Sequence, residues 1–73
     1  MSENTQIKIL QLELKKQEVI AKNLKNKISR YEKANTIVKN TIAQQDIDDL
    51  KTELETAEIQ KEILSSKTKS LQD

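Results

Sequence analysis

The chain has 73 residues, of which 34% are hydrophobic and 34% charged, and its formal net charge is only +1. Tyr31 is its single aromatic residue, and the absence of cysteine and histidine excludes disulfides, thiolate metal sites and catalysis by either residue. There is also no glycine or proline to break a helix, so long helices with charged surfaces are predicted rather than a disordered chain or an aromatic-rich globular core.

Residues 1–5 are expected to form a flexible N-terminus that leads into a first helix over residues 6–38. Asn4 or Thr5 is the expected N-cap of this helix. Within it, apolar residues recur alternately after three and four positions, which is the spacing of a coiled-coil seam. This first seam consists of Ile7, Leu10, Leu14, Gln17, Ala21, Leu24, Ile28 and Tyr31.

A turn is predicted over residues 39–41, because the heptads on either side of it are out of phase. Asn40 can adopt the left-handed conformation that ends a helix, and Thr41 with Gln44 fits a capping box. One continuous helix about 100 Å long, within a coiled-coil oligomer, stays open as the alternative since no glycine marks the turn.

The second helix is predicted over residues 42–71, with residues 72–73 as a flexible C-terminus. It carries the second heptad stripe of the chain. This second seam consists of Ile47, Leu50, Leu54, Ala57, Lys61, Leu64, Thr68 and Leu71.

The two seams match when the chain folds back on itself. In that register Ala21 meets Ala57, and the polar Gln17 meets the polar Lys61, with Asn35 and Ala43 as the last layer before the turn. Residues 21–40 carry six cations and one anion, whereas residues 46–58 carry six anions and one cation, so the two segments would neutralise each other. The predicted fold is therefore all-α, an antiparallel two-helix coiled-coil hairpin.

The same register makes predictions for the charged residues that flank the seam. It sets Lys25 near Lys51 and Glu18 near Glu58, and these like-charge neighbours count against the hairpin. The pairs expected on the opposite edge are favourable, namely Lys27 with Glu53 and Glu13 with Lys67.

Large apolar residues also lie off both seams, in the half of the hairpin that holds the chain ends. They are Ile9, Leu12, Val19, Ile20, Ile59 and Ile63. Because two helices of this size bury little core, we expect this set to associate with another surface. The expected partners are a second copy of the chain, which would complete a four-helix bundle, and another helical protein.

No catalytic residue, cofactor or metal site is predicted. Asp46, Asp48 and Asp49 resemble the start of a calcium loop, but the glycine and the closing glutamate of that loop are missing. These aspartates are instead interpreted as the favourably charged start of a helix.

Three functions follow from this pattern. The first is a non-enzymatic adaptor, assembly factor or chaperone-like subunit that acts through its apolar helix faces. The second is a purely structural coiled-coil scaffold or spacer. The third, a weak binder of nucleic acid or anionic membrane through the basic segment 22–39, ranks last because only Tyr31 could stack on a base. The chain has no apolar run of bilayer length and no features of a signal peptide, so a cytoplasmic location is expected.

Overall fold

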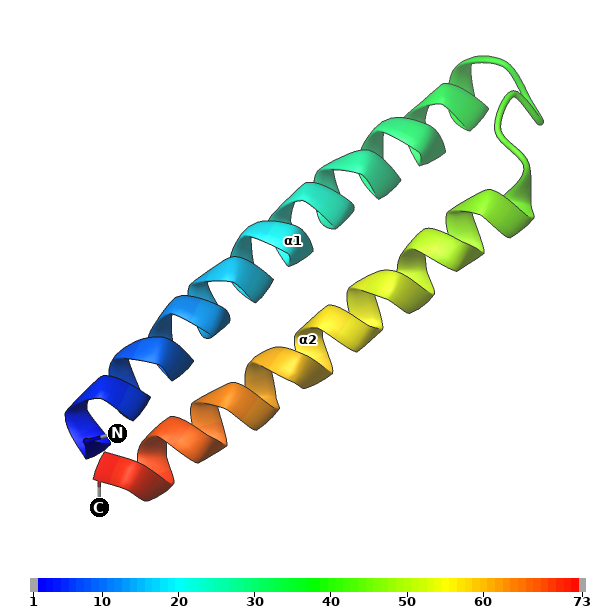
Figure 1. Cartoon of the computed structure of the whole chain (residues 1–73). Coiled ribbons are helices and arrows are strands. Elements are labelled where there is room, and N and C mark those ends of the chain that lie inside the picture. The colour runs from blue at the N-terminus through cyan, green and yellow to red at the C-terminus, as the bar shows by residue number, and fades with distance from the viewer. Residues whose placement is uncertain (1, 73) are drawn as a thin grey trace.

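The computed structural model describes residues 2–72, which form two helices joined by one turn. Helix α1 spans Glu3–Ile37 and helix α2 spans Gln44–Gln72. They run antiparallel and side by side, so that both chain ends lie at one end of the molecule and the turn at the other (Figure 1). The molecule measures 54 × 16 × 14 Å. The predicted antiparallel hairpin is confirmed, and the alternative of one continuous helix is wrong.

Helix α1 begins earlier than the sequence predicted. Ser2 is its N-cap, since the Ser2 hydroxyl accepts a hydrogen bond from the Thr5 amide at 3.2 Å. The expected caps Asn4 and Thr5 are therefore wrong, and residues 3–5, predicted to be flexible, form the first turn of the helix instead. A glutamate at position 3 suits this place because the positive end of the helix dipole attracts its carboxylate. The flexibility predicted for Met1 and Asp73 concerns residues outside those described.

The turn occupies residues 38–43 and is wider than the predicted 39–41. Val38 leaves α1 in an extended conformation, and its amide donates to the Ala34 carbonyl at 3.0 Å. Asn40 has a φ of 63°, the left-handed conformation that asparagine tolerates better than most residues. Asparagine here takes the place that glycine commonly fills at such a bend.

Helix α2 starts at Gln44 instead of residue 42, and the expected capping box does not form. The Thr41 hydroxyl donates to the Val38 carbonyl, at 2.5 Å, and so helps to close the turn. The hydrogen bonding of α2 begins at the Ala43 carbonyl, which accepts from the Asp46 amide at 3.0 Å and from the Ile47 amide at 3.3 Å. The last helical residue is Gln72, one position beyond the predicted end.

Asn35 fastens the two ends of the turn together. Its side-chain amide donates to the Ile42 carbonyl at 3.0 Å, and its side-chain oxygen accepts from the Ile42 amide at 2.8 Å. Both backbone groups of Ile42 are thereby satisfied outside any helix, which matters because an unpaired buried backbone group is costly. The sequence placed Asn35 in a layer with Ala43 but did not predict this two-bond contact.

The core is a single row of side chains between the helices. Every residue assigned to the two seams is buried or half-buried, and the deepest apolar ones are Ala21, Ile28, Ile47, Leu50, Ala57 and Leu64. Ala21 and Ala57 are both almost fully buried, as expected where small side chains let two helices approach. Thr68 is buried as well, and its hydroxyl donates to the Leu64 carbonyl at 2.8 Å.

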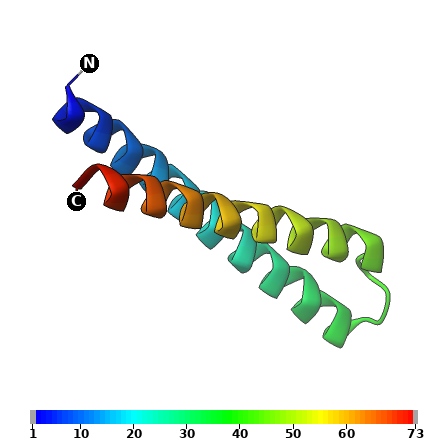
Figure 2. The same cartoon turned by 90° about the horizontal axis from the view of Figure 1, so that it is seen from below.

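Seen from a second direction, the two helices cross at a shallow angle instead of running in strict alignment (Figure 2). This winding keeps a heptad seam between two helices over their whole length, since the heptad drifts slowly around a straight helix. Within residues 2–72, neither helix has the length of apolar sequence needed to cross a membrane.

Candidate interaction surface

Two edges flank the seam, and they differ in chemistry. On the first, which we call the ion-pair edge, Lys25 and Glu32 of α1 face Lys51 and Glu58 of α2. The Lys51 ammonium lies 3.3 Å from the Glu32 carboxylate, and the Lys25 ammonium lies 3.6 Å from the Glu58 carboxylate. The edge therefore joins opposite charges.

This pairing corrects the sequence-based expectation that Lys25 meets Lys51. Glu18 and Glu58 line one shallow groove on this edge, so that expected like-charge neighbour is retained. Side chains on a helix lean toward the N-terminus of that helix. In an antiparallel pair the two side chains therefore lean toward each other along the helix axis. Their ends meet when the Cα atom of each residue lies slightly C-terminal, along its own helix, of the point of contact. Lys25 and Glu58 satisfy this condition, so the expected conflict between Lys25 and Lys51 does not arise.

Glu58 also neutralises the one charge in the seam. Its carboxylate lies 3.5 Å from the half-buried Lys61 ammonium on one side and 3.6 Å from Lys25 on the other. The Glu58 oxygen that faces Lys25 is shielded from solvent and has no hydrogen-bond partner, so the two lysines supply its electrostatic compensation. Gln17, the predicted layer partner of Lys61, is half-buried too.

The six residues predicted as an interface are all exposed. Ile9, Leu12, Val19, Ile20, Ile59 and Ile63 have exposed fractions between 36% and 58%, and we call this set the apolar band. By heptad position all six lie on the outer faces of the helices or toward the second edge, away from the ion-pair edge. The sequence identified these residues, and the hairpin gathers them in the half that holds the chain ends.

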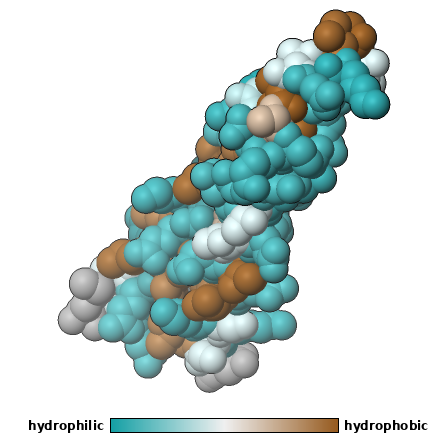
Figure 3. Space-filling view, turned by 90° about the vertical axis from the view of Figure 1, so that its right-hand side faces the viewer, coloured by the Kyte–Doolittle hydropathy of each residue, from teal (hydrophilic) through white to brown (hydrophobic). Residues whose placement is uncertain are grey.

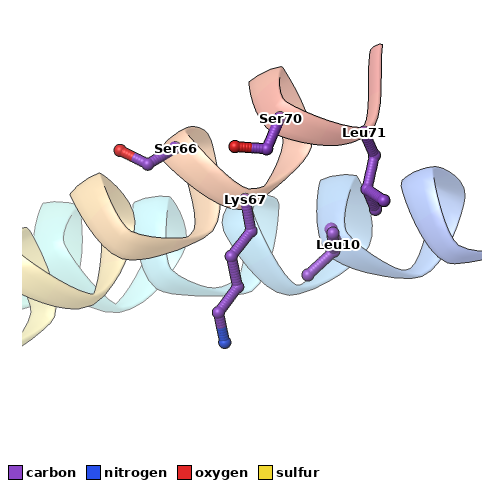
Figure 4. Close-up of a pocket in the computed structure, with 5 residues that line it drawn as sticks. All are labelled: Leu10, Ser66, Lys67, Ser70 and Leu71. Carbon is purple, nitrogen blue, oxygen red and sulfur yellow. The ribbon is translucent and has the colours of Figure 1, made fainter. Parts of the chain in front are cut away.

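The second edge, which we call the groove edge, is hollowed by shallow grooves along the seam. One groove of about 390 Å³ is lined by Leu10 of α1 and by Ser66, Lys67, Ser70 and Leu71 of α2 (Figure 4). Leu10 and Leu71 point toward each other there, so the outermost apolar layer of the core is visible from the surface.

Two members of the apolar band line further grooves on this edge. Ile9 borders a groove of about 350 Å³ together with Gln6, Leu10 and Leu71. Ile20 borders another of about 370 Å³, which also reaches Leu24 and Ala57 of the seam. Ile9 and Ile20 of the apolar band therefore adjoin the core along the groove edge.

The surface view shows the same distribution on one face of the molecule. Apolar patches lie among hydrophilic side chains in the half with the chain ends, and another apolar patch lies at the turn (Figure 3). At the turn, Ile37 and Val38 are 77% and 63% exposed. This exposed pair was not predicted from the sequence, although both residues are apolar and lie next to the predicted turn.

Some residues of the basic and acidic segments make contacts within the hairpin. The Lys27 ammonium lies 5.6 Å from the centre of the Tyr31 ring, a cation–π contact, and Lys25 is paired with Glu58. Among the aspartates, the Asp48 carboxylate accepts from the side-chain amide of Gln44 at 3.0 Å, and the Asp49 carboxylate accepts from the side-chain amide of Gln45 at 2.8 Å. No group of three or more metal-binding side chains comes together within residues 2–72.

Comparison of the chain with family models, curated proteins and solved structures finds no match. Function is therefore inferred from the geometry alone.

Proposed function

We propose that the protein is a small protein–protein interaction module, an adaptor, assembly factor or chaperone-like subunit, that binds through its apolar band. The observation that supports this most strongly is the exposure of six large aliphatic side chains in one half of the hairpin. Scattered exposed apolar residues are common on protein surfaces, but six in one half of so small a molecule favour an interaction site.

The physical driving force is the removal of this band from water. Each Å² of apolar surface that becomes buried contributes about 25 cal/mol, and the grooves beside Ile9 and Ile20 let a partner side chain reach the seam as well. A partner helix lying along the hairpin would present its own apolar side chains at intervals of three and four residues. The interaction therefore needs no catalytic group.

The other two functions have less support. A purely structural scaffold would use the same band for self-association alone, and it differs from the first proposal only in lacking a foreign partner. A nucleic-acid or membrane-surface binder would need the basic segment 22–39, in which Lys25, Lys27 and Tyr31 already make contacts within the chain. We place the protein in the cytoplasm as part of this proposal.

The proposal is tested by placing a photo-crosslinking residue at position 12 in an otherwise unchanged chain and in the variant Ile59→Glu/Ile63→Glu. The matched control is Ile37→Glu, which changes an apolar residue of even greater exposure outside the band. We expect crosslinked products, with a second copy or with another protein, from the unchanged chain and the control. They should be lost from the double variant.

Circular dichroism on all three proteins establishes that the helices persist. If the double variant remains helical and gives the same crosslinked products in the same yield, the apolar band is not the binding surface.

A further inference from the structure

The groove edge of α1 carries a second stripe with coiled-coil spacing. Its members recur alternately after three and four residues and are all exposed: Gln6, Ile9, Glu13, Lys16, Ile20 and Asn23. A stripe with this period stays on one face of a helix that already follows a heptad seam, so it can pack against a second helix along its whole length. It spans about 25 Å of the helix axis.

The chemistry of this stripe is symmetric about its midpoint, between Leu14 and Lys15. The residues next to the midpoint are the oppositely charged Glu13 and Lys16. The next pair outward is Ile9 and Ile20, and the outermost is the polar pair Gln6 and Asn23. The stripe is thus complementary to a copy of itself that runs in the opposite direction.

Helix α2 fits the same symmetry. On the ion-pair edge, a shallow groove brings Leu14 beside Lys61 and Ser65, so Ile63 lies about level with the midpoint of the α1 stripe. A two-fold axis through that midpoint, perpendicular to the helices, sets Ile63 opposite the same residue of a second copy. On either side of it, Gln60 faces Lys67, which is a polar pair.

The opposite alignment, with both turns at the same end, matches poorly. It would set α1 of one copy against α2 of the other at equal levels, so that Ile63 meets Lys16 and Ile9 meets Lys67 or Ser70. Apolar side chains would then face polar ones along the interface. The self-complementary stripe is matched only when the two turns point in opposite directions.

Glu13 and Lys16 are available for such a contact. Neither takes part in the ion pairs recorded for residues 2–72, and the predicted pair of Glu13 with Lys67 is not among those ion pairs. Both residues lie in the half where the apolar band is exposed.

We infer that the partner of the groove edge is a second copy of the chain, docked as a two-fold symmetric dimer with the turns at opposite ends. In this dimer Ile9 packs on Ile20 of the second copy, and two reciprocal Glu13–Lys16 pairs set the register. The inference rests on the proposed function and specifies its partner. It follows the rule that a two-fold interface is self-complementary.

Charge reversal tests the register directly. Glu13→Lys and Lys16→Glu, made separately, each place like charges at both reciprocal contacts, and we expect each to weaken dimerisation about tenfold or more, measured by sedimentation equilibrium. The double variant Glu13→Lys/Lys16→Glu restores opposite charges and should dimerise as the unchanged chain does. A 1:1 mixture of the two single variants should form a heterodimer, because each then supplies the charges that the other lacks.

The mixing experiment is the decisive test. A substitution that only altered the stability of its own hairpin would not make the two single variants prefer each other as partners. Three results would each overturn the inference. The unchanged chain could be monomeric at concentrations on the order of hundreds of micromolar, both single variants could dimerise as tightly as the unchanged chain, or the mixed single variants could form no heterodimer. The proposed function would survive any of these results if the crosslinks from position 12 still disappear with Ile59→Glu/Ile63→Glu. Both proposals fail if those crosslinks also persist.

Discussion

The half of the hairpin near the turn and the half near the chain ends differ in how completely they satisfy their own side chains. Near the turn, Ile28, Ile47 and Leu50 are buried and Asn35 bonds to Ile42, while the exposed large apolar residues are Ile37 and Val38 at the turn itself. Near the chain ends, Leu64 is buried, but Ile7, Leu10 and Leu14 of the seam are only half-buried and the whole apolar band is exposed.

The difference indicates a division of roles along a single pair of helices. The turn half carries the contacts that make the chain fold back. It holds the most deeply buried isoleucine, Ile47, both ion pairs between the helices, and the hydrogen bonds of Asn35 to Ile42. The end half retains apolar surface that a two-helix core cannot cover, because each helix has more than one apolar stripe there. Folding and association are consequently expected to respond to different substitutions.

The largest expected effect is on Ile47, which is 1% exposed. Ile47→Ala should lower the free energy of unfolding by about 2–5 kcal/mol, because it removes buried methyl groups and leaves a cavity. Ile63→Ala, at a residue that is 41% exposed, should cost well under half of that in folding but should weaken association. Urea unfolding monitored by circular dichroism, at a concentration where the chain is monomeric, measures the free energy of unfolding of both variants. An equal loss of unfolding free energy in the two would remove the distinction between the two halves.

The clamp at the turn gives the next largest effect. Asn35→Ala removes both side-chain partners of Ile42 and should cost about 1–3 kcal/mol of unfolding free energy. The matched control is Asn26→Ala, an exposed asparagine within α1, where alanine should be neutral or slightly stabilising because it has the higher helix propensity. Thermal unfolding that is the same for both variants would show that the Asn35 bonds add nothing to stability.

The polar layer of Gln17 and Lys61, in the half near the chain ends, should fix the register of the two helices at some cost in stability. Replacing both members, Gln17→Leu with Lys61→Leu, should raise stability by about 1–2 kcal/mol because two more apolar side chains enter the seam. It should also broaden the distribution of oligomers, since the layer that fixes the register is lost. Melting curves and mass photometry or sedimentation would test this, and a lower melting temperature would contradict the assignment of this layer.

The smallest expected effect is on the ion-pair edge. Glu32→Gln removes the partner of Lys51, and because both side chains are about half exposed the loss should be under about 1 kcal/mol. Glu55→Gln, an exposed glutamate outside the ion pairs of the described residues, is the control. The difference between the two variants should vanish near 1 M salt, and a difference that persists there would require another cause than charge.

The heptads predicted the hairpin and the location of its turn because both depend on local periodicity. The phase change near Val38 marked the turn, and Asn40 adopts the left-handed conformation that was expected of it. The layer of Ala21 and Ala57 could also be predicted from the sequence. An alanine side chain has no rotamers, so whether the two residues meet depends only on the register of the helices.

What the sequence did not predict depends on side-chain direction and on choices among equivalent residues. Ser2, Asn4 and Thr5 are all competent N-caps, and nothing in their local pattern decides among them. The contact of Asn35 with Ile42 spans seven residues of an irregular turn, and no periodic pattern encodes it. The pairing of Lys25 with Glu58 follows from the direction in which side chains lean along each helix. Matching residues only by their height along the two helices does not take this direction into account.

The candidate surface was partly predictable. Composition and periodicity identified the apolar residues off the seam, but their placement away from the ion-pair edge requires both helices in a defined register. Ile37 and Val38 were missed because they lie where the first heptad ends.

Amide hydrogen exchange, read residue by residue at low and at high protein concentration, tests the division between the two halves most directly. The account predicts that protection around Ile28, Ile47 and Leu50 is the same at both concentrations, whereas protection of residues 9–20 and 59–63 rises as the chain associates. Protection that rises first near the turn, or that does not depend on concentration anywhere in the chain, would contradict it.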